Sequence, residues 1–117
     1  MNFKPILIVP GEKRSIFFEI FFKSIRSKKF TSPLILICNK EILKKEVKKY
    51  KFYKKIELID LNQILNKKIK NKKIYLIEIK NSKNYIHECF KVAFYIIKRG
   101  LTNKLINGPI NKSKTLK

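Results

Sequence analysis

The sequence predicts an α/β fold, in which a mostly parallel sheet carries helices on both faces. Short apolar runs of strand length alternate along the chain with longer segments whose apolar residues recur every three or four positions. Turn-forming pairs of proline and glycine follow two of the apolar runs. Because parallel strands need long crossover connections, this alternation favours a parallel sheet with helices packed over it.

The first half of the chain contains two expected strand–helix units. Phe3–Val9 is the first strand, and a Pro-Gly pair ends it. Ser15–Arg26 is a helix so rich in Phe and Ile that we expect it to be largely covered. Pro33–Cys38 is the second strand, and Asn39 follows it at the N-cap position of the next helix, where its side chain can accept hydrogen bonds from free backbone N–H groups.

The second half contains three further expected strands and the most regular helix. Ile56–Ile59 is the third strand, Leu61–Leu65 is a single helical turn, and Ile74–Ile79 is the fourth strand. Asn84–Arg99 is the long helix, with a C-cap glycine directly after it, and Lys104–Asn107 is the fifth strand. The apolar stripe of the long helix is expected to consist of Ile86, Cys89, Phe90, Ala93 and Ile97.

Length and composition favour one domain. The chain has 117 residues, of which 44% are hydrophobic, and no repeat or linker divides it, so residues 1–117 are expected to form a single α/β unit. The apolar runs are much shorter than the roughly 20 residues that span a bilayer, and no secretory signal is recognisable. We therefore expect a cytoplasmic location without membrane contact. Cys38 and Cys89 are expected to be buried free thiols.

The net charge of +21 comes almost entirely from lysine, and the lysines are spread from one end of the sequence to the other. Proteins that bind nucleic acids cluster Lys and Arg instead. Together with the abundance of Ile and Asn, this spread indicates an A+T-rich coding bias that acts on exposed positions. Solvated surface lysines are therefore the favoured interpretation, and a basic nucleic-acid-binding module is the alternative.

Two turns follow strands where a ligand site is expected. In an open parallel sheet, ligands bind beyond the carboxyl ends of the strands. That rule selects the turn Pro10–Ser15 after the first strand and the turn Asn107–Lys112 after the fifth. We expect both turns at the same edge of the sheet, where Lys13, Arg14 or Lys112 can act as counter-charges for an anionic ligand.

The sequence offers no catalytic group of its own. His87 is the only histidine and falls on the polar side of its helix, and one His without a carboxylate cluster cannot build a three-ligand metal site. With only Gly11, Gly100 and Gly108 available, a glycine-rich phosphate loop is also excluded.

The segment Gly108–Lys112, with the sequence Gly-Pro-Ile-Asn-Lys, resembles the 4-hydroxythreonine-4-phosphate dehydrogenase family. Members carry Gly or Ala, Pro, Ile or Val, Asn and Lys after a strand, and this segment fits at every position. A second segment, Ile8–Ile20, is similar to the family's opening strand and turn. It departs from the family's small residues and prolines at Lys13, Arg14, Ser15, Phe17 and Phe18, and it matches at Gly11, Glu12, Ile16, Glu19 and Ile20.

The resemblance implies an isocitrate/isopropylmalate-dehydrogenase-like α/β fold, of which this chain is the incomplete amino-terminal part. It also implies a homodimer, NAD as the oxidant, a divalent metal, and a phosphorylated hydroxythreonine as the substrate in pyridoxal phosphate biosynthesis. The family's metal-binding and cofactor-binding residues lie downstream of the motif, so NAD and metal are not expected to bind this chain alone, and the chain is expected to be inactive alone. The residues that the resemblance places along the substrate site are Gly11, Glu12, Glu19, Gly108, Pro109, Asn111 and Lys112.

A related dehydrogenase of the same family, acting on a four-carbon acid phosphate, remains a second alternative beside the nucleic-acid-binding module. The sequence cannot separate the two substrates, because most of the residues that would select between them lie beyond residue 117.

Overall fold

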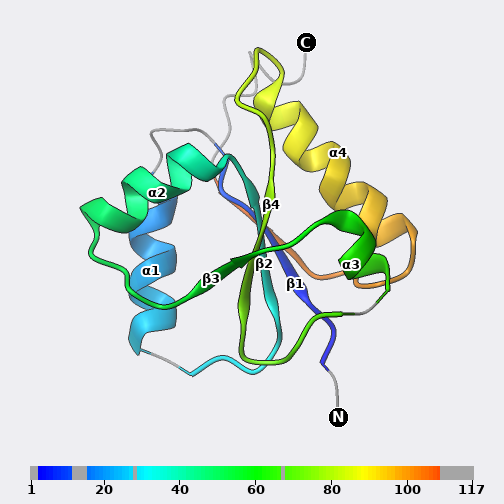
Figure 1. The fold of residues 1–117 in the computed structure, drawn as a ribbon, viewed down its shortest axis with the longest axis horizontal. Coiled ribbons are helices and arrows are strands. Elements are labelled where there is room, and N and C mark those ends of the chain that lie inside the picture. Colours follow the sequence, from blue (N-terminus) through cyan, green and yellow to red (C-terminus); the bar gives the residue numbers. More distant parts are fainter. Residues whose placement is uncertain (1–2, 12–15, 28, 67, 109–117) are drawn as a thin grey trace.

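A parallel sheet in the order β3-β4-β2-β1-β5 forms the centre of the molecule (Figure 1). The computed structural model describes residues 3–11, 16–27, 29–66 and 68–108. The strands are β1 (Ile6–Val9), β2 (Leu34–Cys38), β3 (Ile56–Leu58), β4 (Ile74–Glu78) and β5 (Leu105–Asn107). The helices are α1 (Phe17–Ser27), α2 (Lys40–Lys49), α3 (Leu61–Leu65) and α4 (Tyr85–Lys98). Every pair of neighbouring strands in the described part of the chain is parallel, so the predicted α/β class is confirmed.

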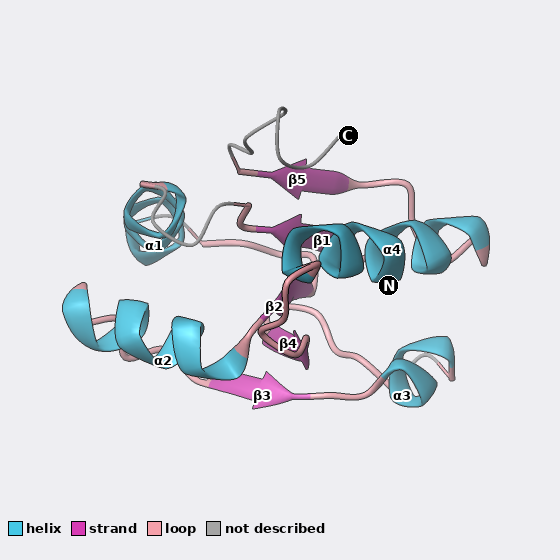
Figure 2. Ribbon diagram, turned by 90° about the horizontal axis from the view of Figure 1, so that it is seen from above, coloured by secondary structure: helices cyan, strands magenta, loops and turns pink. Residues whose placement is uncertain are grey.

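The helices form two layers, one on each face of the sheet (Figure 2). Helices α1 and α2 lie on one face, and α3 and α4 lie on the other. This arrangement follows from the strand order and the right-handedness of parallel crossovers. The chain moves from β1 through β2 to the β3 edge with its helices on one face, and it returns through β4 to β5 with its helices on the opposite face. The prediction of helices on both faces is therefore confirmed.

The core lies on both sides of the central strands. All five residues of β2 are buried, and β1 and β4 are buried along most of their length. Strands covered on both faces need apolar side chains on both faces, which is why these segments read as continuous apolar runs. On the α1 side, the fully buried Phe22 stacks on Phe52 with 4.5 Å between ring centroids.

Each expected strand is present and is shorter at one end than the sequence indicated. The first strand begins at Ile6 rather than Phe3, directly after Pro5, which has no backbone N–H to donate to a neighbouring strand. At this end of the sheet, the buried Thr102 donates its hydroxyl hydrogen to the carbonyl of Pro5 over 2.6 Å. That bond joins the segments that lead into β5 and β1.

Two expectations about helix faces are wrong in part. Helix α1 is not covered all round, because it faces the sheet with Phe18, Phe22 and Ile25 and leaves Ile20 54% exposed on its other side. In α4, the most buried line consists of Tyr85, Cys89, Ala93 and Ile96 rather than the predicted stripe. The other members of the predicted stripe, Ile86, Phe90 and Ile97, are half-buried beside this line. The line is displaced because the hydroxyl group of Tyr85 has a buried polar partner, so this tyrosine packs inward.

Two further expectations can be compared with the described residues. Cys38 and Cys89 are both free and buried, as predicted. Among the described helices, none is both long enough and apolar enough to cross a membrane.

Candidate functional site

The two predicted turns begin side by side at the carboxyl edge of the sheet. Strands β1 and β5 come from opposite ends of the chain but pair directly, with Leu7 opposite Leu105 and Val9 opposite Asn107. The pairing continues one residue further, since the Gly108 N–H donates to the carbonyl of Val9 over 2.8 Å. The turns after the two strands therefore start next to each other, as the sequence predicted for a shared site.

Gly108 packs directly on the first turn. A Cβ atom added at residue 108 would overlap the carbonyl oxygen of Pro10 and would lie 2.8 Å from its carbonyl carbon and 3.0 Å from Cδ1 of Phe17. Such distances are well below ordinary carbon–carbon contact. Glycine is thus required at this position by the closeness of the two turns.

Gly11 is needed for a different reason. Its φ angle is +88°, in the left-handed region where a side chain is strained. Gly11 follows Pro10 directly and is itself buried. The two glycines that the family resemblance selected therefore have distinct physical roles in one local structure.

The remaining predicted site residues are only partly described. Glu19 lies in the first turn of α1, and its carboxylate accepts a hydrogen bond from Lys23 Nζ over 3.4 Å on the exposed surface. Its place in a substrate site stays a prediction. The other predicted residues lie outside the described ranges, namely Glu12, Lys13, Arg14, Pro109, Asn111 and Lys112.

A buried polar cluster at the ends of β2 and β4 was missed by the sequence analysis. Asn39 is 8% exposed, and its Oδ1 accepts from the N–H groups of Glu41 and Ile42 at 3.0 and 3.1 Å, which caps α2 as predicted. Its Nδ2 also donates to the carbonyl of Ile79 over 3.0 Å, and its backbone N–H donates to Tyr85 Oη over 2.8 Å. The N-cap position was readable from sequence, but the link to β4 and α4 was not.

This cluster lies at the point where the sheet changes the direction of its connections. The loop after β2 leads to α2 on one face, and the loop after the neighbouring β4 leads to α4 on the other. Open α/β sheets often bind ligands in the crevice at such a point. Here Asn39 and Tyr85 connect the two loops by hydrogen bonds, so these polar groups already have partners within the protein. The better candidate site is therefore the pair of turns that contain Gly11 and Gly108, here called the two glycine turns.

The two cysteines beside this cluster are unsuited to nucleophilic chemistry. Burial raises the pKa of the Cys38 thiol well above its ordinary value, and the nearby Cys89 raises it further. Burial also raises the pKa of Cys89 to about 12, although a hydrogen bond with Tyr85 opposes the rise. Since only the thiolate is a good nucleophile, these groups are structural at neutral pH.

The described residues do not provide a metal centre. No three His, Cys, Asp or Glu side chains within residues 3–11, 16–27, 29–66 and 68–108 are grouped so that they could hold a metal ion. The metal that the family resemblance implies therefore finds no fitting ligand set within these described residues.

An open parallel sheet with helices on both faces, in which Gly108 packs against Pro10 at the carboxyl edge, defines an α/β protein. Its fold is shared with solved 4-hydroxythreonine-4-phosphate dehydrogenases. The Klebsiella pneumoniae enzyme matches with a TM-score of 0.72 and 17% identity, over 95% of this chain and 38% of that one. The Burkholderia phymatum enzyme matches with a TM-score of 0.71 and 15% identity, over 97% of this chain and 38% of that one.

A Salmonella typhimurium protein described as a 4-hydroxythreonine-4-phosphate dehydrogenase matches with a TM-score of 0.72 and 20% identity. The match covers 96% of this chain and 39% of that one. These likenesses confirm the expected isocitrate/isopropylmalate-dehydrogenase-like α/β fold, present here in part. The chain spans 38–39% of the length of the three proteins. No protein-family model matches the sequence, and no curated protein matches it.

Proposed function

We propose that this chain forms one wall of the substrate site of a 4-hydroxythreonine-4-phosphate dehydrogenase, an NAD-dependent enzyme of pyridoxal phosphate biosynthesis. The observation that carries the proposal is the packing of Gly108 on Pro10 at the carboxyl edge of the sheet. It occurs in a fold shared over nearly the whole chain with solved enzymes of that name. The family-like sequence Gly-Pro-Ile-Asn-Lys starts at this contact.

In this proposal the chain binds and orients the substrate. Gly11 and Gly108 carry no side chain, so the backbone of both turns can approach a ligand closely. The ammonium group of Lys112 suits the substrate phosphate as a counter-charge, and the amide of Asn111 can donate or accept a hydrogen bond. The carboxylates of Glu12 and Glu19 suit a substrate ammonium group.

The remaining parts of the reaction belong to other segments of the enzyme in this proposal. NAD would supply the hydride acceptor and a divalent metal would polarise the substrate oxygens, and we assign neither to this chain. The 117 residues alone are proposed to be inactive, because they span 38% of the length of the enzymes whose fold they share. A homodimeric, cytoplasmic enzyme is part of the same proposal.

A chimera tests the function. This chain replaces the structurally equivalent segment of the Klebsiella pneumoniae enzyme, and NAD reduction is measured with the phosphorylated hydroxythreonine. We expect turnover by the chimera and none by the 117-residue chain. In the chimera, Lys112→Met should lower kcat/KM by roughly 30-fold or more, because a charge that contacts substrate phosphate is lost. The matched control Lys117→Met removes the same charge outside the motif and should leave kcat/KM unchanged.

If Lys112→Met and Lys117→Met lowered kcat/KM equally, the proposed contact between Lys112 and the substrate phosphate would be contradicted. A chimera that folds but does not turn over the substrate would contradict the proposal that this chain forms a wall of the substrate site. Turnover of a four-carbon acid phosphate in preference to the phosphorylated hydroxythreonine would favour the related dehydrogenase instead.

The net charge of +21 favours one further candidate, a basic nucleic-acid-binding module. That function requires RNA or DNA binding that persists at moderate salt, which fluorescence anisotropy with labelled oligonucleotides measures. Binding that disappears at moderate salt, without sequence preference, would leave the lysines as a solvated surface.

A further inference from the structure

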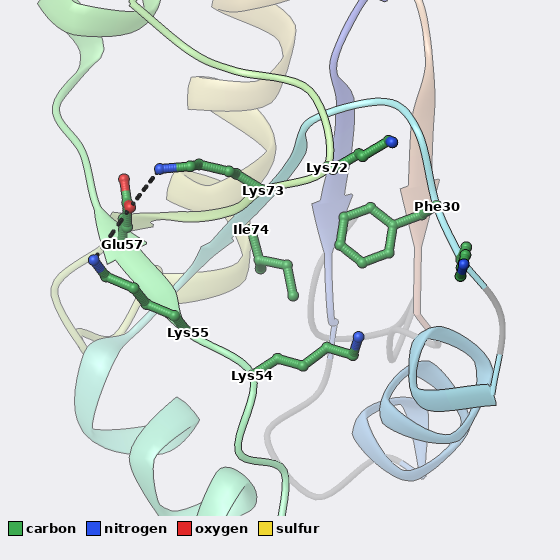
Figure 3. A pocket seen from close by; sticks show the side chains of 8 residues that line it. Phe30, Lys54, Lys55, Glu57, Lys72, Lys73 and Ile74 are labelled. Carbon is green, nitrogen blue, oxygen red and sulfur yellow. Dashed lines mark hydrogen bonds and ion pairs between the residues drawn. The ribbon is translucent and has the colours of Figure 1, made fainter.

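A basic hollow lies at the amino edge of the sheet, opposite the two glycine turns (Figure 3). It has a volume of about 510 Å³ and is formed by the segments that lead into β2, β3 and β4. Since the three strands are parallel, their leading segments meet at one edge although they are far apart in sequence. The lining residues are Lys29, Phe30, Lys54, Lys55, Glu57, Lys72, Lys73 and Ile74.

The charge of the hollow is strongly unbalanced. The lining contains five lysines and one glutamate, so four of the positive charges have no negative counterpart there. Glu57 Oε1 pairs with Lys73 Nζ at 3.1 Å and with Lys55 Nζ at 3.5 Å. The hydrogen bond with Lys73 lowers the pKa of Glu57 below its ordinary value, so the carboxylate stays charged and holds both ammonium groups.

The other three lysines are available to a ligand. Within the described residues, Lys29, Lys54 and Lys72 have no carboxylate within ion-pair distance. Lys54 Nζ lies 5.9 Å from the centre of the Phe30 ring, so an aromatic side chain supports its ammonium group.

The backbone around the hollow is also fixed. Lys72 has a φ angle of +63°, and its N–H donates to the carbonyl of Thr31 over 2.9 Å. This bond joins the segment before β4 to the segment before β2. Figure 3 shows Phe30 and the buried Ile74 at the centre of the view, with Lys54, Lys55, Lys72 and Lys73 around them.

We propose that this hollow binds an oligophosphate group, either free or as part of a nucleotide. Ammonium groups act as point charges toward phosphate oxygens, and a chain of phosphates carries enough negative charge to engage several lysines at once. The volume lies in the range of small-molecule sites, roughly 300–1,000 Å³. A single orthophosphate can contact only some of these lysines, so affinity should rise with the number of linked phosphates.

Calorimetric titration of the 117-residue chain at physiological ionic strength tests the site. The probes are sodium tripolyphosphate, ATP and orthophosphate. We expect saturable binding of tripolyphosphate, roughly tenfold or more tighter than orthophosphate, because each added charge pair changes affinity severalfold. ATP binding equal to tripolyphosphate would assign recognition to the phosphates alone, and tighter ATP binding would identify a nucleotide as the ligand. Failure of both oligophosphates to exceed orthophosphate would overturn the site.

Charge-matched variants locate the binding. Lys54→Glu with Lys72→Glu should weaken tripolyphosphate binding by at least about tenfold. The control Lys83→Glu with Lys91→Glu makes the same change in net charge at exposed positions near and on α4, outside the hollow, and should have little effect. Equal weakening by both pairs would mean that only the overall positive field attracts the anion.

Amide chemical shifts of the unmutated chain give a test that does not depend on the variants folding. Tripolyphosphate should move the signals of Lys54, Lys55, Lys72 and Lys73 and leave Gly11 and Gly108 unmoved. The reverse pattern would contradict the assignment. A single-stranded oligonucleotide that binds tightly, and that excess tripolyphosphate fails to displace, would show a nucleic-acid surface in place of a small-anion site. The inference is independent of the proposed dehydrogenase, since the hollow and the glycine turns lie at opposite edges of the sheet.

Discussion

Replacing Gly108 by alanine should disrupt the contact between β1 and β5. The new Cβ would overlap the carbonyl oxygen of Pro10 and lie 2.8 Å from its carbon, where ordinary contacts begin near 3.4 Å. The overlap can be relieved only if the two turns separate. That separation would break the 2.8 Å hydrogen bond between the Gly108 N–H and the Val9 carbonyl. Overpacking costs about 1–3 kcal/mol and the lost hydrogen bond about 1 kcal/mol, so we expect a destabilisation of about 2–4 kcal/mol.

The measurement is urea unfolding, followed by amide hydrogen exchange in β1 and β5. Because β5 is an edge strand among the described strands, part of the strain can be relieved by local opening, which exchange detects even where global stability changes less. Gly100→Ala is the matched control. Gly100 has a φ angle of +80° but no atom within 4 Å of an added Cβ, so it should cost only about 1–2 kcal/mol from backbone strain. A Gly108→Ala variant that is as stable as wild type, or exchange that is no faster in β5 than in the Gly100→Ala variant, would refute the steric argument.

Two further predictions concern the cluster between β2 and β4. Asn39→Ser keeps the cap of α2 but removes the bond to the Ile79 carbonyl, so it should cost about 1–2 kcal/mol in urea unfolding, and Asn39→Ala should cost about 1 kcal/mol more because the cap is lost as well. Equal stability of wild type and Asn39→Ser would mean that this bond contributes nothing. The raised pKa of Cys89 means that the thiol stays protonated in the folded chain while it ionises in the unfolded chain above its ordinary value of 9.0. The free energy of unfolding should therefore fall between pH 9.0 and about 12. Unfolding curves recorded across this pH range should show a smaller fall for Cys89→Ala than for wild type. An equal fall in the two proteins would contradict a buried, neutral thiol at Cys89.

Local patterns were sufficient to predict the elements and their order. The runs that became β1, β2 and β4 are apolar on both faces because both faces are covered, and strand length separates them from helices. Asn39 was recognised as a cap because an N-cap interaction involves only the next few residues. The sequence analysis predicted the wrong buried line for α4 because tyrosine is amphipathic, and its sequence position alone does not show whether it faces inward. The hydrogen bond that Tyr85 Oη accepts from the Asn39 N–H decides this.

The sequence by itself determined the α/β class, the alternation of strands and helices, and the two turns that resemble a dehydrogenase motif, because each depends on residues that are neighbours in the chain. Tertiary structure alone decided that β5 pairs with β1, so that Gly108 meets Pro10. It also gathered five lysines, which the sequence spreads among three segments, around one hollow at the amino edge. Strand order sets both contacts, and strand order is decided by how the whole chain buries its apolar faces, which no local pattern records.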